Sequence, residues 1–257
     1  MKIKVFEAFA GYGSQALALE RLKQTYPQFE YECVGISEID KYAIQAYNTL
    51  HSGVTNYGDI SKIDWSQVPD FDLLTYSFPC TDISSAGQQK GLAKNSGTHS
   101  SLLWECEKAI EIKRPKYLLM ENVVALIQSK FIKYFHEWQR ILEGYGYSNF
   151  SQVMNAKDYG VPQNRERIFM VSILGDEQFY FPKPFKSNKR LKDVLEQNVD
   201  ERYYLSNKTI QSMRNHCERK QAEGCGFKFG PTNEGGIAKT ISTLAGNRQT
   251  DNFIQEE

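Results

Sequence analysis

The sequence predicts an α/β fold built on a mostly parallel sheet with helices on both faces, followed by a small, irregular and partly β region. The first observation is that strand-like apolar segments alternate with segments of helical periodicity over residues 1–174. Such alternation is typical of parallel sheets that are covered on both faces. The second observation is that the pattern ends near residue 176, where prolines appear and a Gly- and Thr-rich stretch follows. We therefore expect two domains, residues 1–175 and residues 176–257.

The first half of the predicted sheet domain contains two strands and two helices. An apolar strand is expected over residues 2–9, and a glycine-containing turn ends it. Residues 14–26 have helical spacing, and residues 31–37 form the second apolar strand. The next helix is expected over residues 40–51, where Asp40 is a suitable N-cap.

The second half continues the same alternation. Strands are expected over residues 70–77, 116–122 and 166–174, because each segment is short and apolar. Helices are expected over residues 100–113 and 130–146, and the second of these is amphipathic and ends in glycines.

Composition places the chain among soluble globular proteins. Its 257 residues are 40% hydrophobic and 24% charged, with a formal net charge of zero. We find no signal peptide and no segment long enough to span a bilayer, so we expect a cytoplasmic protein without a membrane partner. The basic run KPFKSNKRLK at residues 183–192 could contact phosphates, although charge alone favours a solvated face.

Five cysteines occur without a CxxC spacing, namely Cys33, Cys80, Cys106, Cys217 and Cys225. In a reducing cytosol they are expected to be free thiols. His216 lies beside Cys217 and near Cys225, but no zinc spacing fits this group. We therefore expect no metal.

The first strand leads into a glycine-containing turn, FEAFAGYGSQAL, that suits a cofactor. Gly11 and Gly13 allow a tight turn and close approach of a ligand to the start of the next helix. Glu38 lies 25 residues after Gly13, a spacing that suits an acid accepting hydrogen bonds from ribose hydroxyls. Asp59 falls at the expected end of the next strand, where it would receive an adenine amino group or act as a turn or cap residue. The alternative interpretation is that these glycines only form a turn and bind no ligand.

Reactive side chains follow two later strands. Cys80, in SFPC, is a candidate nucleophile, metal ligand or small hydrophobic residue. Glu121, in MENV, brings a carboxyl group to the same expected edge of the sheet, unless it merely caps a helix. Arg165 and Arg167 alternate in QNRER, so an extended backbone would direct both to one face, where they could hold a phosphate, a carbonyl oxygen or a carboxylate.

The ordered set FAGYG, SEID, GDI, SFPCTDISSAGQQKG, ENV and QNRER resembles the cytosine carbon-5 DNA methyltransferases. The resemblance covers residues 3 to about 173. It implies a Rossmann-like catalytic domain over residues 1–175 and a partial target-recognition region over residues 176–257. It also implies that the cofactor is S-adenosyl-L-methionine, that the product is S-adenosyl-L-homocysteine, and that the main partner is double-stranded DNA.

The resemblance also implies a role for individual residues. Cys80 would attack carbon 6 of a cytosine flipped out of the helix, Glu121 would protonate ring nitrogen 3, and Arg167 would contact the oxygen at position 2. Arg165 would lie near the phosphate or the nucleophile. The expected cofactor-binding residues are Phe9, Ala10, Gly11, Gly13, Ser14, Glu38, Ile39, Asp59, Ile60, Phe78 and Leu102. The expected substrate-binding residues are Ser84, Gln88, Asn122 and Val123. Residues 84–100 would form the loop that closes over the base.

The chain departs from the family pattern at two places. Thr81 replaces the glutamine that usually follows the catalytic cysteine. The conserved carboxyl-terminal segments of the family are not recognised in the sequence. This leaves open a partner polypeptide that supplies them, a truncated chain, and a compact form that acts alone or has lost activity. A tRNA cytosine methyltransferase and a non-catalytic subunit that binds cofactor or DNA are the alternative functions. We expect a bacterial or phage setting, either in restriction–modification or as an orphan enzyme.

Overall fold

A computed structural model describes residues 2–83, 91–94, 96–224, 230–241 and 252–255. The described chain divides into two compact units. Unit 1 comprises residues 1–153 and 167–181, and unit 2 comprises residues 154–166 and 182–257. Residues 154–166 thus group with the carboxyl-terminal region, whereas the sequence placed them in the first domain. The boundary expected at residues 175/176 stays a prediction.

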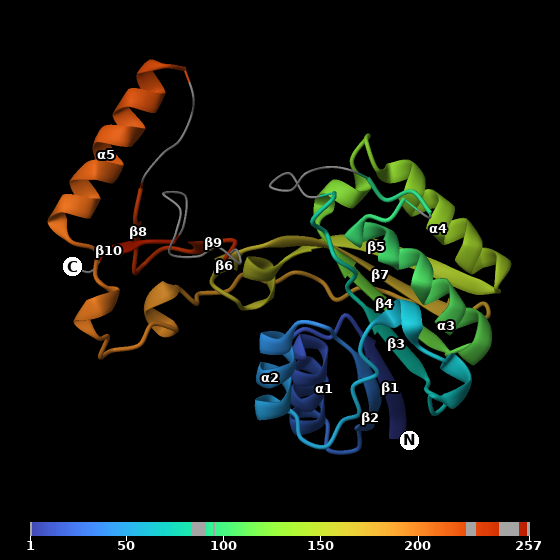
Figure 1. The fold of residues 1–257 in the computed structure, drawn as a ribbon. Helices are drawn as coiled ribbons and strands as arrows, with labels where there is room; N and C mark the ends of the chain where they lie inside the picture. The colour runs from blue at the N-terminus through green and yellow to red at the C-terminus, as the bar shows by residue number, and fades with distance from the viewer. Residues whose placement is uncertain (1, 84–90, 95, 225–229, 242–251, 256–257) are drawn as a thin grey trace. The chain divides into compact units, whose positions relative to one another are not determined.

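A six-stranded sheet forms the centre of unit 1, in the order β2-β1-β3-β4-β7-β5 (Figure 1). Its strands are β1 (Lys2–Ala8), β2 (Glu30–Ser37), β3 (Leu73–Tyr76), β4 (Tyr117–Asn122), β5 (Tyr147–Asn155) and β7 (Glu166–Leu174). Strand β1 pairs in parallel with β2 and β3, and β3 pairs in parallel with β4. Strand β7 runs antiparallel to β4, which places Glu121 opposite Phe169. The predicted α/β fold with a mostly parallel sheet is confirmed.

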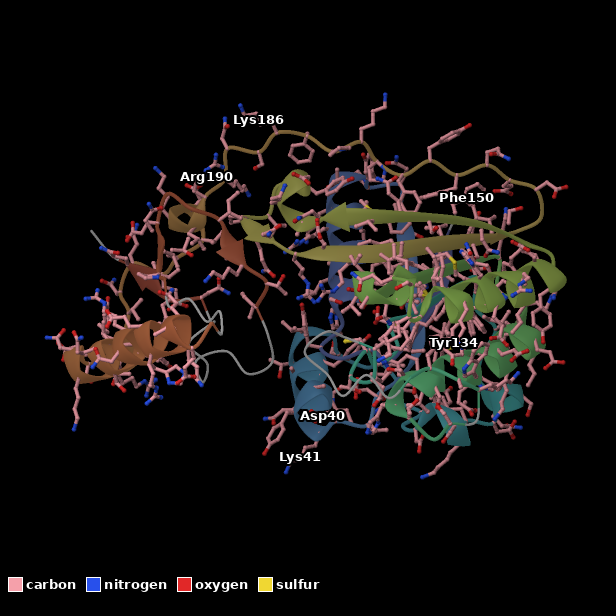
Figure 2. All side chains as sticks on the ribbon, turned by 90° about the horizontal axis from the view of Figure 1, so that it is seen from above. Asp40, Lys41, Tyr134, Phe150, Lys186 and Arg190 are labelled. Atoms are coloured by element: carbon pink, nitrogen blue, oxygen red, sulfur yellow. The ribbon has the colours of Figure 1, made fainter. Side chains whose placement is uncertain are left out.

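Helices cover both faces of this sheet. They are α1 (Ser14–Thr25), α2 (Lys41–Leu50), α3 (Glu105–Lys113) and α4 (Ile132–Gly144). Helices α1 and α2 lie against one face, and α3 and α4 lie against the other (Figure 1). Asp40 caps α2 as predicted, because its carboxylate accepts the backbone N–H groups of Tyr42 and Ala43. Figure 2 shows Asp40 and Lys41 at this end of the helix.

The main core of unit 1 lies on the α3 and α4 side of the sheet. Apolar side chains of β1, β3 and β4 meet the buried stripes of both helices there, and Trp138 and Ile110 are completely buried. Burying side chains of this size contributes about 1.5–3 kcal/mol each. A smaller cluster of Ala10, Ile36 and Tyr47 fills the opposite side. The two clusters hold the strand ends that carry the candidate site.

Unit 2 is built from short elements and one long helix. These are β6 (Gln163–Asn164), α5 (Asn207–Ala222), β8 (Thr232–Asn233), β9 (Ala238–Lys239) and β10 (Ile254–Gln255). Strand β6 pairs with β9, and β8 pairs with β10. The short strands agree with the expected partly β region, whereas the 16-residue helix α5 was not predicted. Among the described residues, none of the helices has the length and hydropathy needed to cross a bilayer.

Candidate active site

The turn after β1 has a backbone that only specific residues tolerate. Phe9, Gly11 and Gly13 all have positive φ, at 56°, 58° and 83°. A non-glycine residue in this region costs about 1–2 kcal/mol, so Phe9 is strained. Such strain concentrates at ligand sites, which makes the turn a candidate cofactor loop. Ala10 is buried beside the turn, and Ser14 is exposed as the first residue of α1.

Glu38 joins this turn to the end of β2. Its Oε2 accepts the Gly11 N–H at 2.8 Å, and its Oε1 accepts the backbone N–H groups of Ile39 and Asp40, both at 2.8 Å. A carboxylate has about four acceptor positions, so these three bonds leave it the capacity to accept from a hydroxyl group. Ile39 is 70% exposed beside it. The donor and acceptor set therefore fits a ribose-bearing cofactor.

Glu7 is a buried carboxylate below the same turn that could not be singled out from its chemistry alone. It is 1% exposed, and it accepts the backbone N–H of Ala16 at 3.0 Å and the hydroxyl of Tyr47 at 2.7 Å. Because Gly13 has no side chain to cap α1, Glu7 satisfies one of the free N–H groups of that helix. Burial raises the pKa of the Glu7 carboxyl, opposed by its hydrogen bonds. The sequence feature that could have identified Glu7 is the presence of a charged residue inside an otherwise apolar strand.

Asp59 does not end a strand, contrary to the expectation. It is the N-cap of a short 3₁₀ helix (Ile60–Lys62), and its Oδ1 accepts the Ser61 backbone N–H at 3.0 Å and the Ser61 hydroxyl at 2.7 Å. The Ser61 hydroxyl bond is the main cause that lowers the pKa of Asp59. The chain reaches this position through an isolated bridge between Ile36 and Asn56 rather than a full strand. Ile60 is buried in the core behind it.

Cys80 lies four residues beyond the end of β3, in a turn in which its carbonyl accepts the Ile83 N–H at 3.1 Å. It is half-buried and packs against the main core. Phe78 is buried just before it, and Leu102 packs against the same core. The expected position at the carboxyl edge of the sheet is thus the observed one. Ser84 and Gln88, expected to bind substrate, lie outside the described residues.

Asn122 connects the Cys80 segment to the end of β4. Its Nδ2 donates to the Phe78 carbonyl at 3.0 Å, and its Oδ1 accepts the Val123 N–H at 2.8 Å. Asn122 is 2% exposed, so both bonds are shielded from water. This places the residue next to Glu121 in direct contact with the segment that carries the thiol.

Glu121 and Arg167 form an ion pair across the antiparallel strands β4 and β7. Arg167 Nε lies 2.9 Å from Glu121 Oε1, and the two side chains are only 17% and 24% exposed. Since Glu121 faces Phe169 in the register, Arg167 is its diagonal neighbour, within reach of a long side chain. The pair therefore holds the Glu121 carboxyl group in a fixed orientation at the strand end.

Arg165 belongs to unit 2, whereas Arg167 belongs to unit 1. Within unit 2 the Arg165 backbone N–H donates to Asn155 Oδ1 at 3.0 Å, and its guanidinium lies 3.5 Å from the Ile241 carbonyl.

In the parts of the chain that are described, no group of three or more His, Cys, Asp or Glu side chains is placed to hold a metal ion.

The sheet order, the glycine turn with its acid, and the thiol and carboxyl groups at strand ends define an α/β protein of the methyltransferase class. A family model described as C-5 cytosine-specific DNA methylase matches residues 3–255, and the chain belongs to this family. This confirms the predicted family and enzyme class.

Individual relatives agree with that assignment. The chain is 40% identical to the type II methyltransferase M2.ScrFI of Lactococcus lactis subsp. cremoris, over 81% of this chain and 71% of the relative. It is 37% identical to the type II methyltransferase M.NlaX of Neisseria lactamica, over 93% of this chain and 74% of the relative. The crystal structure of S. pombe Dnmt2 methyltransferase shares the fold, with a TM-score of 0.74 at 18% identity, over 99% of this chain and 76% of that one.

Proposed function

We propose that this chain transfers a methyl group to carbon 5 of cytosine in duplex DNA, with Cys80 as the nucleophile. The observation that carries the proposal is the Asn122–Phe78 hydrogen bond of 3.0 Å. It joins the segment bearing the Cys80 thiol to the strand end bearing the Glu121 carboxyl and its Arg167 partner. A nucleophile and a proton donor on neighbouring strand ends are what addition to a cytosine ring requires.

The residues supply the chemistry as follows. The Cys80 thiol loses its proton to water, and the thiolate forms a bond from Sγ to carbon 6 of the ring. Glu121 donates a proton to ring nitrogen 3, and the electron pair of the 5,6 double bond becomes available at carbon 5. The Arg167 guanidinium, 2.9 Å from Glu121, stabilises the carboxylate that remains. After methylation, water takes the proton from carbon 5, and the electron pair of that C–H bond re-forms the 5,6 double bond. The Sγ–C6 bond breaks to release the thiolate, and ring nitrogen 3 returns its proton to the Glu121 carboxylate.

S-adenosylmethionine, when bound, supplies the methyl group and leaves as S-adenosylhomocysteine. Phe9, Gly11 and Gly13 would surround it, and the carboxylate of Glu38 would accept hydrogen bonds from its ribose. The orientation of Glu38 supports this assignment, because three backbone N–H groups hold the carboxylate in place before any ligand arrives. Such preorganisation lowers the entropic cost of binding.

The DNA must release the target base from the helix, because a stacked cytosine cannot reach a thiol in a protein turn. Basic side chains of the segment after β7, including Lys186 and Arg190, are suited to contact phosphates (Figure 2). The names of the relatives, type II methyltransferases of bacteria, support a restriction–modification role in a bacterial cytoplasm. The partner polypeptide considered from the sequence stays a prediction.

Transfer of a labelled methyl group tests the proposal. The purified chain is incubated with labelled S-adenosylmethionine and a long mixed-sequence duplex, and the nucleosides are then separated. We expect label in 5-methyldeoxycytidine with the wild type and with a Cys217→Ala control, and none with Cys80→Ala. Label in tRNA but not in DNA would instead support the tRNA enzyme. Calorimetric cofactor binding without transfer to either nucleic acid would support a non-catalytic subunit.

A further inference from the structure

Ser100 and Asp82 form a buried hydrogen-bonded pair beside the candidate nucleophile. The Ser100 backbone N–H donates to Asp82 Oδ2 at 3.1 Å, and the Asp82 backbone N–H donates to Ser100 Oγ at 3.3 Å. The Ser100 hydroxyl in turn donates to the Pro79 carbonyl at 2.7 Å. Ser100 is completely buried and Asp82 is 6% exposed. The two residues are 18 positions apart in the chain, so this contact is set by tertiary structure rather than by a local turn.

These bonds fix the backbone on both sides of Cys80. Ser100 Oγ holds the carbonyl of the Pro79–Cys80 peptide, and the Ile83 N–H holds the carbonyl of the Cys80–Thr81 peptide at 3.1 Å. Two planar peptide units meet at the Cys80 Cα, so fixing both planes fixes the direction of its Cα–Cβ bond. The thiol then retains only the rotation of its side chain about that bond.

Burial makes the loss of either side chain costly. The Asp82 carboxylate lies in a shielded environment, and its Oδ2 satisfies the Ser100 N–H there. If either side chain is lost, a buried donor or acceptor loses its partner, and the backbone must move to regain one. A displacement of about 1 Å near a reacting atom can slow a reaction roughly 100-fold.

We propose that Ser100 and Asp82 are positioning residues that hold the Cys80 thiol in the orientation needed for attack on carbon 6. The inference rests on the proposed function, in which Cys80 is the nucleophile. It assigns the two residues no contact with substrate or cofactor. Their effect is therefore expected on the rate of bond formation at Cys80, with DNA affinity unchanged.

Trapping of the covalent adduct tests this inference. The wild type and its variants react with a mixed-sequence duplex in which 5-fluorodeoxycytidine replaces deoxycytidine, with S-adenosylmethionine present. The rate of adduct formation at saturating DNA is measured on denaturing gels, and DNA affinity is measured separately. The variants are Ser100→Ala, Asp82→Ala and the conservative Asp82→Asn, whose amide oxygen can still accept the Ser100 N–H. Ser101→Ala is the matched control, because among the described residues the Ser101 hydroxyl donates to the Thr98 carbonyl alone, at 2.7 Å, within its own turn.

We expect adduct formation to be about 10- to 100-fold slower in Ser100→Ala and Asp82→Ala, with unchanged DNA affinity. Asp82→Asn and Ser101→Ala should remain within about 3-fold of the wild type, because both keep the acceptor for the Ser100 N–H at residue 82. If both alanine variants react as fast as Ser101→Ala, or if Asp82→Asn is as slow as Asp82→Ala, the inference is wrong. Absence of any adduct in the wild type would overturn the proposed function itself and this inference with it.

Discussion

Replacing Gly13 by alanine gives a direct measure of how tightly the candidate cofactor turn packs on α2. A Cβ at this position would lie 2.4 Å from His51 Nε2 and 2.8 Å from Tyr47 Cε2. Tyr47 cannot move aside easily, because it is completely buried and its hydroxyl bonds to Glu7 at 2.7 Å. Gly11 offers a matched comparison, since its φ is also positive but, among the described residues beyond its chain neighbours, no atom lies within 4 Å of its Cβ position.

The two substitutions separate backbone strain from side-chain overlap. Each places a side chain in the left-handed region, which costs about 1–2 kcal/mol. Only Gly13→Ala also forces overlap in a packed site, which costs a further ~1–3 kcal/mol. We therefore expect Gly13→Ala to lower the free energy of unfolding more than Gly11→Ala does, by about 1–3 kcal/mol.

Thermal and urea denaturation of the two variants provide the assay. At ~2–4 °C per kcal/mol for a chain of this size, the midpoints should differ by roughly 2–12 °C. Equal loss of stability in both variants would show that the rings of His51 and Tyr47 do not lie under Gly13, and would refute the described packing of the turn.

Three further predictions concern the strand ends. Asn122→Ala leaves the Phe78 carbonyl without its buried donor, so unfolding should become easier by about 1–3 kcal/mol, measured by urea titration; an unchanged midpoint would contradict the contact. Arg167→Ala removes the partner of Glu121 and should lower kcat for methyl transfer roughly 100-fold or more, comparable to Glu121→Gln; full activity would exclude the proposed role of the pair. Burial raises the pKa of Glu7 above its ordinary value of 4.5, so its contribution to stability is most favourable below that pH and is lost as the pH rises through the raised pKa. Urea midpoints between pH 4 and pH 8 should therefore fall less steeply with rising pH in Glu7→Gln than in the wild type, and identical slopes would contradict the assignment.

The sheet of unit 1 could be predicted from sequence because most of its strands are short apolar segments bounded by turns. Strand β5 was missed because its segment, YSNFSQVMN, is polar and largely half-exposed, without a continuous apolar run. Helix α5 was missed for a similar reason, since Cys217 is its only buried residue. In both elements, position in the fold rather than hydrophobic periodicity determines the structure.

In the candidate site, too, sequence indicates individual residues but not the contacts that the fold creates between them. Cys80 and Glu121 could be proposed from their chemistry and their places after apolar segments. The contact of Glu121 with Arg167 could not, because it depends on the antiparallel register of β4 and β7. Ser100 and Asp82 carry no sequence signal at all, since their pairing spans 18 residues and exists only in the folded chain.

The claim that Cys80 forms a covalent bond to cytosine can be tested most directly by mapping the trapped adduct. The wild-type protein is reacted with duplex DNA containing 5-fluorodeoxycytidine and S-adenosylmethionine, digested with protease and nuclease, and sequenced by mass spectrometry. We predict a single modified peptide whose nucleotide is attached to Cys80. Attachment to another cysteine, or methylated DNA without any covalent adduct to the protein, would contradict the proposed mechanism.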